Sequence, residues 1–117
     1  MIVGIGLDIV ELARIERFYR DKPSFATRIL TPAEQKEFAR LSGRRAIEYL
    51  AGRFAAKEAY AKAIGTGLGA ACGFQDIEVL KSPSGAPVLR ANKEERRVHI
   101  SVTHSEQVAC VQVIIEE

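Results

Sequence analysis

The segment 54–67, FAAKEAYAKAIGTG, constrains the fold of this chain more than any other stretch. Its alanines and closing glycines predict the last turns of a helix with a face of small side chains. Glu58 and Lys62 lie four positions apart, so they stand one above the other on that helix. A charged pair among alanines either faces water or serves a site. If it is buried, the Glu58 carboxylate needs a cation or hydrogen bonds, because an unpaired buried charge is very costly.

A second carboxylate follows the first apolar stretch of the chain. Residues 2–7 are predicted to form a strand that carries Gly4 and Gly6 on one face, and Asp8 continues that face. Two glycines on one face leave room for another backbone or for a ligand. Asp8 has two interpretations: it caps the helix that follows, or it joins Glu58 in a shared site.

The remaining patterns indicate an alternation of helices and then strands. A capping box with proline at the first helical position starts at Thr31, and the segment before it is interpreted as a loop. The expected elements are an amphipathic helix over 10–20, a short helix from the capping box to near Gly43, a long helix over 44–64, a strand over 74–80, a turn over 82–87 leading into a return strand, and a hairpin of 97–103 with 108–115. This order predicts one α+β domain spanning residues 1–117, with a mainly antiparallel sheet and a long central helix.

Composition excludes several classes of protein. A net charge of +2 is too small to indicate nucleic-acid binding. The two cysteines do not form a Cys-x-x-Cys motif, so they are interpreted as small hydrophobic residues. No stretch is long enough to span a bilayer, and the first residues lack the basic lead of a signal peptide. A cytoplasmic location is therefore expected.

Asp8 and Glu58, without a cluster of histidines or cysteines, suit Mg²⁺, which prefers oxygen ligands and commonly bridges one or two carboxylates to substrate phosphates. From spacing alone the simpler readings stay open: a helix cap for Asp8 and an ordinary surface pair of Glu58 with Lys62. The other cations on the long helix would neutralise phosphate oxygens or form a solvated face. They are Arg45, Arg53 and Lys57.

Three blocks, taken in order, carry a family resemblance. They are GIGLD at 4–8, FAAKEAYAK at 54–62 with GTG at 65–67, and ISVTHS at 100–105. Each block alone is modest, but the ordered set spans nearly the whole chain. The chain resembles the holo-[acyl-carrier-protein] synthases, the small single-domain class of 4′-phosphopantetheinyl transferases.

The resemblance implies a Mg²⁺-dependent reaction in which coenzyme A donates its phosphopantetheine arm to a serine of apo acyl carrier protein. Adenosine 3′,5′-bisphosphate leaves, and the product supports fatty acid biosynthesis. The resemblance also implies homotrimers with active sites between subunits. Asp8 and Glu58 match the metal ligands of the family, and Lys62 joins them as a catalytic residue. Contacts to the nucleotide or its phosphates are implied for Arg45, Arg53, Lys57, Gly65, Gly85, Pro87 and His104.

The carrier protein is usually acidic, and the first helix offers Arg14 and Arg17 beside Phe18. That surface suits recognition of a partner helix by complementary charge, with Lys22 and Arg28 as further docking residues. The alternative from another class is a non-catalytic basic module that docks acidic proteins or RNA. A pure binding module has no need of Asp8 and Glu58.

Overall fold

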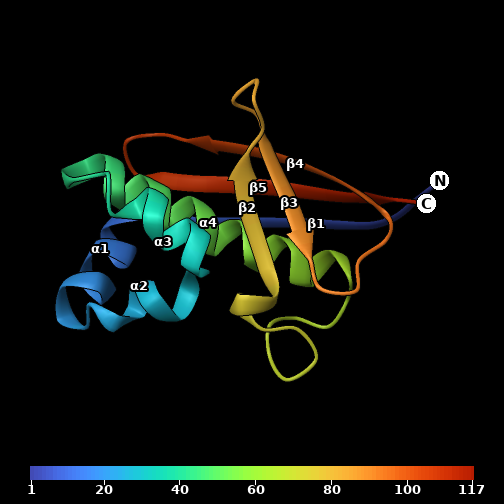
Figure 1. Cartoon of the computed structure of the whole chain (residues 1–117), viewed down its shortest axis with the longest axis horizontal. Coiled ribbons are helices and arrows are strands. Elements are labelled where there is room, and N and C mark those ends of the chain that lie inside the picture. Colours follow the sequence, from blue (N-terminus) through green and yellow to red (C-terminus); the bar gives the residue numbers. More distant parts are fainter.

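The structure, a computed structural model, describes all residues from 1 to 117. Strands begin and end the chain, and the helices lie between them (Figure 1). The elements are β1 (Ile2–Glu11), α1 (Leu12–Asp21), α2 (Ser24–Ile29), α3 (Pro32–Phe38), α4 (Gly43–Ala63), the 3₁₀ helix η1 (Phe74–Asp76), β2 (Ile77–Lys81), β3 (Pro87–Ala91), β4 (Arg97–His104) and β5 (Val108–Glu116).

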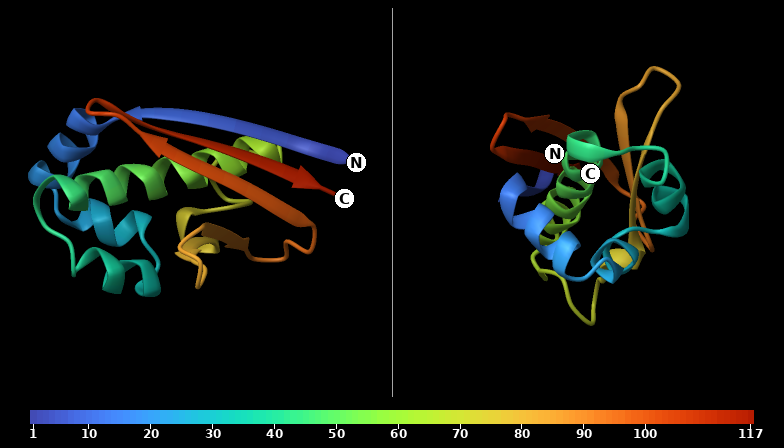
Figure 2. Two further views of the ribbon diagram at one scale, coloured as in Figure 1. Left: turned by 90° about the horizontal axis from the view of Figure 1, so that it is seen from above. Right: turned by 90° about the vertical axis from the view of Figure 1, so that its left-hand side faces the viewer.

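The strands form two antiparallel sheets. A three-stranded sheet has the order β1-β5-β4, and β2 with β3 forms a separate hairpin. Helix α4 runs along one face of the three-stranded sheet, and the two views in Figure 2 show α1, α2 and α3 gathered beside it. In the register of the sheet, Asp8 lies opposite Val111, which lies opposite Val102 on its other side. This arrangement confirms the expected α+β class.

Alternation on β5 explains how the sheet meets α4. Val111, Val113 and Ile115 are fully buried, because every second side chain of a strand points to the same face. Their partners on α4 are small, and Ala55 and Ala59 are likewise fully buried. Small side chains on the helix let it approach the sheet closely, and the core is continuous from the sheet through α4 to β2.

The outer face of β1 is apolar and open. Val3, Ile5, Leu7 and Ile9 expose 43%, 59%, 56% and 64% of their surface. They alternate along a strand at the edge of its sheet, so they form one continuous stripe. An exposed apolar stripe of this kind commonly marks an interaction surface.

Two sequence predictions about local structure are confirmed. The capping box is present, since the Thr31 side chain accepts from the Glu34 amide and the Glu34 carboxylate accepts from the Thr31 amide. The long helix predicted over 44–64 and the C-terminal hairpin lie within a few residues of their expected bounds.

Other predicted boundaries are wrong. Strand β1 continues to Glu11, because its backbone pairs with β5 along the whole of this length, and α1 therefore starts at Leu12. The helix from the capping box ends at Phe38, short of Gly43. The segment interpreted as a loop before Thr31 contains helix α2.

The strand predicted over 74–80 instead begins as η1. The amide of Gly73 donates to Asp76 Oδ2 at 2.8 Å and closes a turn there, so the extended strand starts only at Ile77. No helix in the structure combines the length and the apolar character needed to cross a membrane.

Candidate functional site

Two glycines bring β1 against α4. A Cβ atom on Gly6 would overlap the carbonyl oxygen of Ala59 and would stand 2.9 Å from the amide nitrogen of Ala63. Ordinary contact begins near 3.4 Å, so only glycine lets the two backbones approach this closely. Gly4 meets the carbonyl of Ala63 in the same way. The space predicted beside these glycines is therefore filled by the helix, and Asp8 is carried to the side of α4.

Asp8 meets Lys62 across this contact. Lys62 Nζ donates to Asp8 Oδ1 at 3.0 Å and to the carbonyl oxygen of Leu7 at 3.0 Å. The Asp8 side chain is 15% exposed, whereas that of Lys62 is 51% exposed, so the pair lies at the mouth of a site that solvent reaches. The interpretation of Asp8 as a helix cap is wrong, because Asp8 lies within β1 and the N-cap of α1 is Glu11.

Glu58 lies close enough to Asp8 for their charges to interact. Burial raises the pKa of Glu58, and the negative charge of Asp8 raises it further, while Lys62 and Arg14 act in the opposite direction. No ion pair within 4.0 Å joins Lys62 to Glu58, so the reading of these two as an ordinary surface pair along the helix is wrong. Two carboxylates held side by side gain from a shared cation.

The donor set fits a hard cation. Asp8 and Glu58 supply only oxygen, which is the ligand that Mg²⁺ prefers. No three His, Cys, Asp or Glu side chains come together as a metal cluster. An ion bound by these two carboxylates would complete its coordination with oxygens from water or from another molecule. The chemistry of such a site favours a phosphorylated ligand.

Lys57 does not contribute to this site. Its ammonium group donates to the carboxylate of Glu34 at 2.6 Å, to the carbonyl of Ile29 at 2.7 Å and to the carbonyl of Phe74 at 3.1 Å. Lys57 and Glu34 are both fully buried, and burial lowers the pKa of Lys57 while Glu34 opposes that shift. All three protons have acceptors, so the structure contradicts the prediction that Lys57 contacts a phosphate.

Arg53 is also turned into the molecule. Its Nε donates to the carbonyl of Val79 at 3.1 Å, and its guanidinium lies 4.2 Å from the centre of the Tyr49 ring. Nη2 is buried, lacks a hydrogen-bond partner and stands 3.8 Å from Glu37 Oε1. In this chain Arg53 therefore joins α4 to β2, and its covered guanidinium leaves no path for the phosphate contact predicted from the sequence.

Comparison with known proteins places the chain in a family. The sequence model of the 4′-phosphopantetheinyl transferase superfamily matches residues 4–113, which include Asp8, Glu58 and Lys62. The chain belongs to this superfamily.

Several relatives of the superfamily match along nearly the full chain. The holo-[acyl-carrier-protein] synthase of Shouchella clausii is 53% identical over 116 residues, 99% of each chain. A holo-(acyl-carrier-protein) synthase from Bacillus anthracis, solved in complex with CoA (3′,5′-ADP), has a TM-score of 0.92 at 49% identity and covers 98% of this chain and 96% of its own. The synthase from Neisseria meningitidis has a TM-score of 0.91 at 40% identity and covers all of both chains.

The other residues that the sequence assigns to a nucleotide lie at separate places in this transferase fold. His104 ends β4, where its Nδ1 stands 3.5 Å from Glu48 Oε2. Arg45 is exposed in the first turn of α4. Gly85 lies in the turn between β2 and β3, in the hairpin that projects at the top of Figure 1, and Gly65 follows the C-cap of α4. Pro87 starts β3.

The predicted docking residues gather on one face of α1 and on α2. The Arg14 guanidinium lies 5.2 Å from the centre of the Phe18 ring, and the Phe18 and Phe25 rings pack at a tilt with their centres 5.5 Å apart. A hollow of about 330 Å³ lies here, lined by Phe18, Asp21, Lys22, Ser24, Phe25 and Arg28. Arg17 is exposed on α1. The hollow therefore combines two aromatic side chains with the basic Lys22 and Arg28 and the acidic Asp21.

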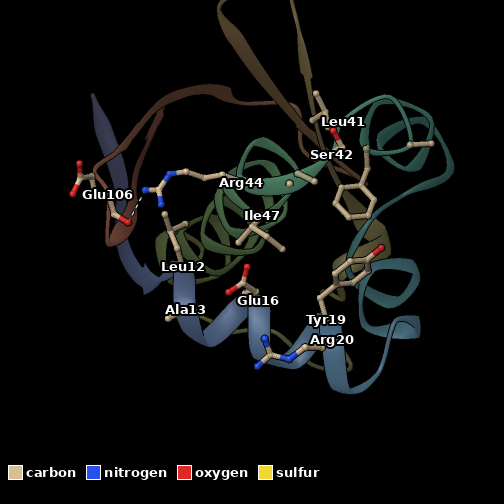
Figure 3. A pocket seen from close by; sticks show the side chains of 14 residues that line it. Leu12, Ala13, Glu16, Tyr19, Arg20, Leu41, Ser42, Arg44, Ile47 and Glu106 are labelled. Atoms are coloured by element: carbon tan, nitrogen blue, oxygen red, sulfur yellow. Dashed lines mark hydrogen bonds between the residues drawn. The ribbon is translucent and has the colours of Figure 1, made fainter.

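A second hollow, of about 870 Å³, opens on the opposite side of α1 (Figure 3). Leu12, Glu16 and Tyr19 line it from α1, and Ile47 lines it from α4. Glu16 points into it in Figure 3. At 100° per residue this face of α1 lies across the helix from Arg14, so the hollow is separate from the docking face.

Sequence reasoning missed the partners that fix these side chains. Glu34 was identified only as the acid of a capping box, yet one of its oxygens also accepts from Lys57, and the other accepts from the Val79 amide at 2.8 Å. Glu48, which stands near His104, belongs to no sequence motif. The sequence offers one indication of such partners. Arg53 and Lys57, if buried, require acceptors elsewhere in the fold.

Proposed function

We propose that this chain transfers the 4′-phosphopantetheine group of coenzyme A to a serine hydroxyl of apo acyl carrier protein. The serine oxygen bonds to the β-phosphorus of coenzyme A, the pyrophosphate bridge breaks, and adenosine 3′,5′-bisphosphate leaves. The observation that carries the proposal is the meeting of Asp8, Glu58 and Lys62 in a chain whose relatives are named holo-[acyl-carrier-protein] synthases. A cytoplasmic location and a role in fatty acid biosynthesis belong to the same proposal.

The reaction requires positioning and charge neutralisation more than covalent help from the enzyme. Asp8 and Glu58 would hold Mg²⁺, which when bound supplies charge neutralisation at the diphosphate. Lys62 is paired with Asp8 and is half exposed, so its ammonium group can reach a phosphate oxygen and balance the charge on the leaving group. Glu58, or a water that it orients, accepts the serine proton.

The nucleotide contacts proposed for Arg45, His104, Gly85 and Pro87 need a second copy of the chain. Arg45 lies in the first turn of α4, thirteen residues before Glu58 and about 20 Å away along the helix axis, and Gly85 and Pro87 belong to the β2–β3 hairpin, which is separate from the sheet that carries Asp8. The apolar stripe of Val3, Ile5, Leu7 and Ile9 lies on the strand that carries Asp8, so burying it against another copy brings a second chain to the side of the site. We propose a homotrimer, with the Gly65 loop and the partner's residues together enclosing the nucleotide.

The partner protein is an acidic carrier. Arg14, Arg17, Lys22 and Arg28 attract it, and Phe18 offers the apolar contact at the centre of the basic surface. Arg14 also acts on the charge of Glu58, so the docking face and the acidic site are adjacent. This adjacency would deliver the carrier serine to the diphosphate.

The decisive experiment is incubation with apo carrier, coenzyme A and Mg²⁺, followed by mass spectrometry of the carrier. We expect the mass of one phosphopantetheine group to be added, and we expect Glu58→Gln and Asp8→Asn to abolish the addition while the far-ultraviolet circular dichroism stays unchanged. Absence of transfer by the wild-type chain refutes the reaction and favours a non-catalytic module for acidic proteins or RNA. Full activity of both variants at saturating Mg²⁺ refutes the metal role.

Two variants test the assembly and the docking face. Ile5→Asp places charge in the apolar stripe and should convert an oligomer into monomers in light scattering, with loss of activity. A fully active monomeric wild type would exclude a shared site.

Arg14→Glu should raise the KM for carrier at low salt and leave coenzyme A affinity little changed. An unchanged carrier KM would refute docking on α1.

A further inference from the structure

Helix α2 has only six residues and carries part of the docking face. Phe25 and Arg28 line the hollow beside Phe18. A helix this short is not stable by itself, and its last four carbonyl groups have no partners within the helix. The placement of Phe25 and Arg28 therefore depends on contacts that other elements make to α2.

The side chain of Gln75, in η1, reaches these carbonyls. Its Nε2 lies 3.2 Å from the oxygen of Thr27, 3.2 Å from that of Arg28 and 2.8 Å from that of Leu30. The remaining carbonyl, that of Ile29, accepts from the buried Lys57 ammonium at 2.7 Å. The Leu30 carbonyl also accepts from Gln35 Nε2 of α3 at 2.9 Å, so the carbonyls of Thr27 and Arg28 are the ones that Gln75 alone contacts.

The two side chains differ in burial. Lys57 is fully buried and joins an ion pair in the core, so its loss damages the whole fold. Gln75 is exposed, and every acceptor it contacts belongs to α2 or to the residue that ends it. Aromatic side chains also connect α2 to η1 through α4. The ring centres of Phe25 and Phe54 lie 6.1 Å apart, and Phe54 stacks on Phe74 at 5.7 Å. Removing Gln75 therefore loosens α2 and leaves the core in place.

We propose that Gln75 is a positioning residue for carrier recognition, because it fixes the end of α2 and so the direction of the Arg28 side chain. This inference rests on the proposed function. Gln75 does not contact the carrier, coenzyme A or the reacting atoms. It holds a docking side chain in one arrangement, so that the carrier does not have to order α2 when it binds.

The test uses Gln75→Met, which keeps the length of the side chain and removes its donors. We expect the KM for apo carrier to rise roughly 3- to 10-fold, the equivalent of one ordinary hydrogen-bonding group. The kcat and the KM for coenzyme A should stay within twofold of the wild type. The matched control is Asn92→Ala, which removes the 2.9 Å bond from Asn92 Nδ2 to Asp76 Oδ1 on η1 and touches nothing in α2. It should leave the carrier KM unchanged.

A double-mutant cycle with Arg28→Ala separates positioning from a general structural effect. If Gln75 acts through Arg28, its replacement has little further effect on the carrier KM once Arg28 is alanine. Additive effects overturn the proposal. So does an unchanged carrier KM for Gln75→Met, or an equal rise in both substrate KM values. If the wild type transfers no phosphopantetheine, the proposed function itself fails. An active wild type whose carrier KM does not change in Gln75→Met would refute only the positioning role of Gln75.

Discussion

Replacing Gly6 by alanine tests how β1 is held against α4. The added Cβ would overlap the Ala59 carbonyl oxygen, and it would stand 2.8 Å from the Ala59 carbonyl carbon and 2.9 Å from the Ala63 amide nitrogen. All three atoms are backbone, so no side-chain rotation can relieve the overlap. Strand and helix would have to separate by about an ångström or more before ordinary contact is restored.

The separation has two costs. Over-packed cores typically lose 1–3 kcal/mol, and we expect about 3 kcal/mol here because the contact is between two backbones. For a domain of this size that lowers the unfolding midpoint by roughly 10–15 °C. It also moves Asp8 away from Glu58, and a shift of about 1 Å in a positioned group lowers the rate by about 100-fold.

Thermal unfolding and the carrier mass assay check both costs. Two other glycines provide controls, since a Cβ on Gly52 meets only Val102 Cγ1 at 3.7 Å and a Cβ on Gly69 meets nothing within 4 Å. Gly52→Ala lies inside α4 and should be neutral or stabilising, because alanine favours a helix by about 1 kcal/mol over glycine. A Gly6→Ala variant with wild-type melting and wild-type activity would refute the close approach of β1 and α4.

Three further predictions concern titration and burial. In an NMR titration without divalent ions, Asp8→Asn should lower the pKa of Glu58, because burial raises that pKa first and the negative charge of Asp8 raises it further; an unchanged pKa would show that the two carboxylates are not neighbours. Lys57→Met leaves Glu34 charged and unpaired in the core, so denaturant unfolding should show a loss of about 3–5 kcal/mol, and a loss below about 1 kcal/mol would contradict the buried pair. The Arg96 guanidinium donates to Glu94 and lowers the pKa of that carboxyl from 4.5 to about 2. The ionised Glu94 carboxylate therefore stabilises the fold fully above pH 4.5, and this contribution disappears as the pH falls toward 2. Glu94→Gln should therefore cost stability at neutral pH and little at pH 2, and an equal cost at both would exclude a charged carboxylate as the cause.

The docking face depends on residues that do not themselves contact the carrier protein. Its cations come from α1, from α2 and from Lys22 between them, but the end of α2 is held from η1, α3 and α4. Substitutions near residue 75 are therefore expected to change carrier recognition without changing any residue at the docking surface.

Local chemistry made part of the fold predictable. The capping box at Thr31 and Glu34 depends on residues three positions apart, and the periodicity of 44–64 repeats within one helix. The loop interpretation failed at α2 because that helix has too few residues to show a pattern. The carbonyl groups of Thr27, Arg28 and Ile29 at its end accept from Gln75 and Lys57, which are distant in the sequence.

The sequence by itself determined the element types along most of the chain and, through the ordered blocks, the family and its acidic pair. Only the tertiary structure decided what each charge on α4 does. Lys57 and Glu58 are consecutive, yet one is sealed in the core with Glu34 and the other faces Asp8. Helical geometry fixes the 100° between them. Two contacts decide which side of the helix meets the core. Gly4 and Gly6 let β1 approach the backbone of α4, and Glu34 supplies the buried acceptor for Lys57. Both contacts join residues that are far apart in the sequence, so no short sequence window contains them.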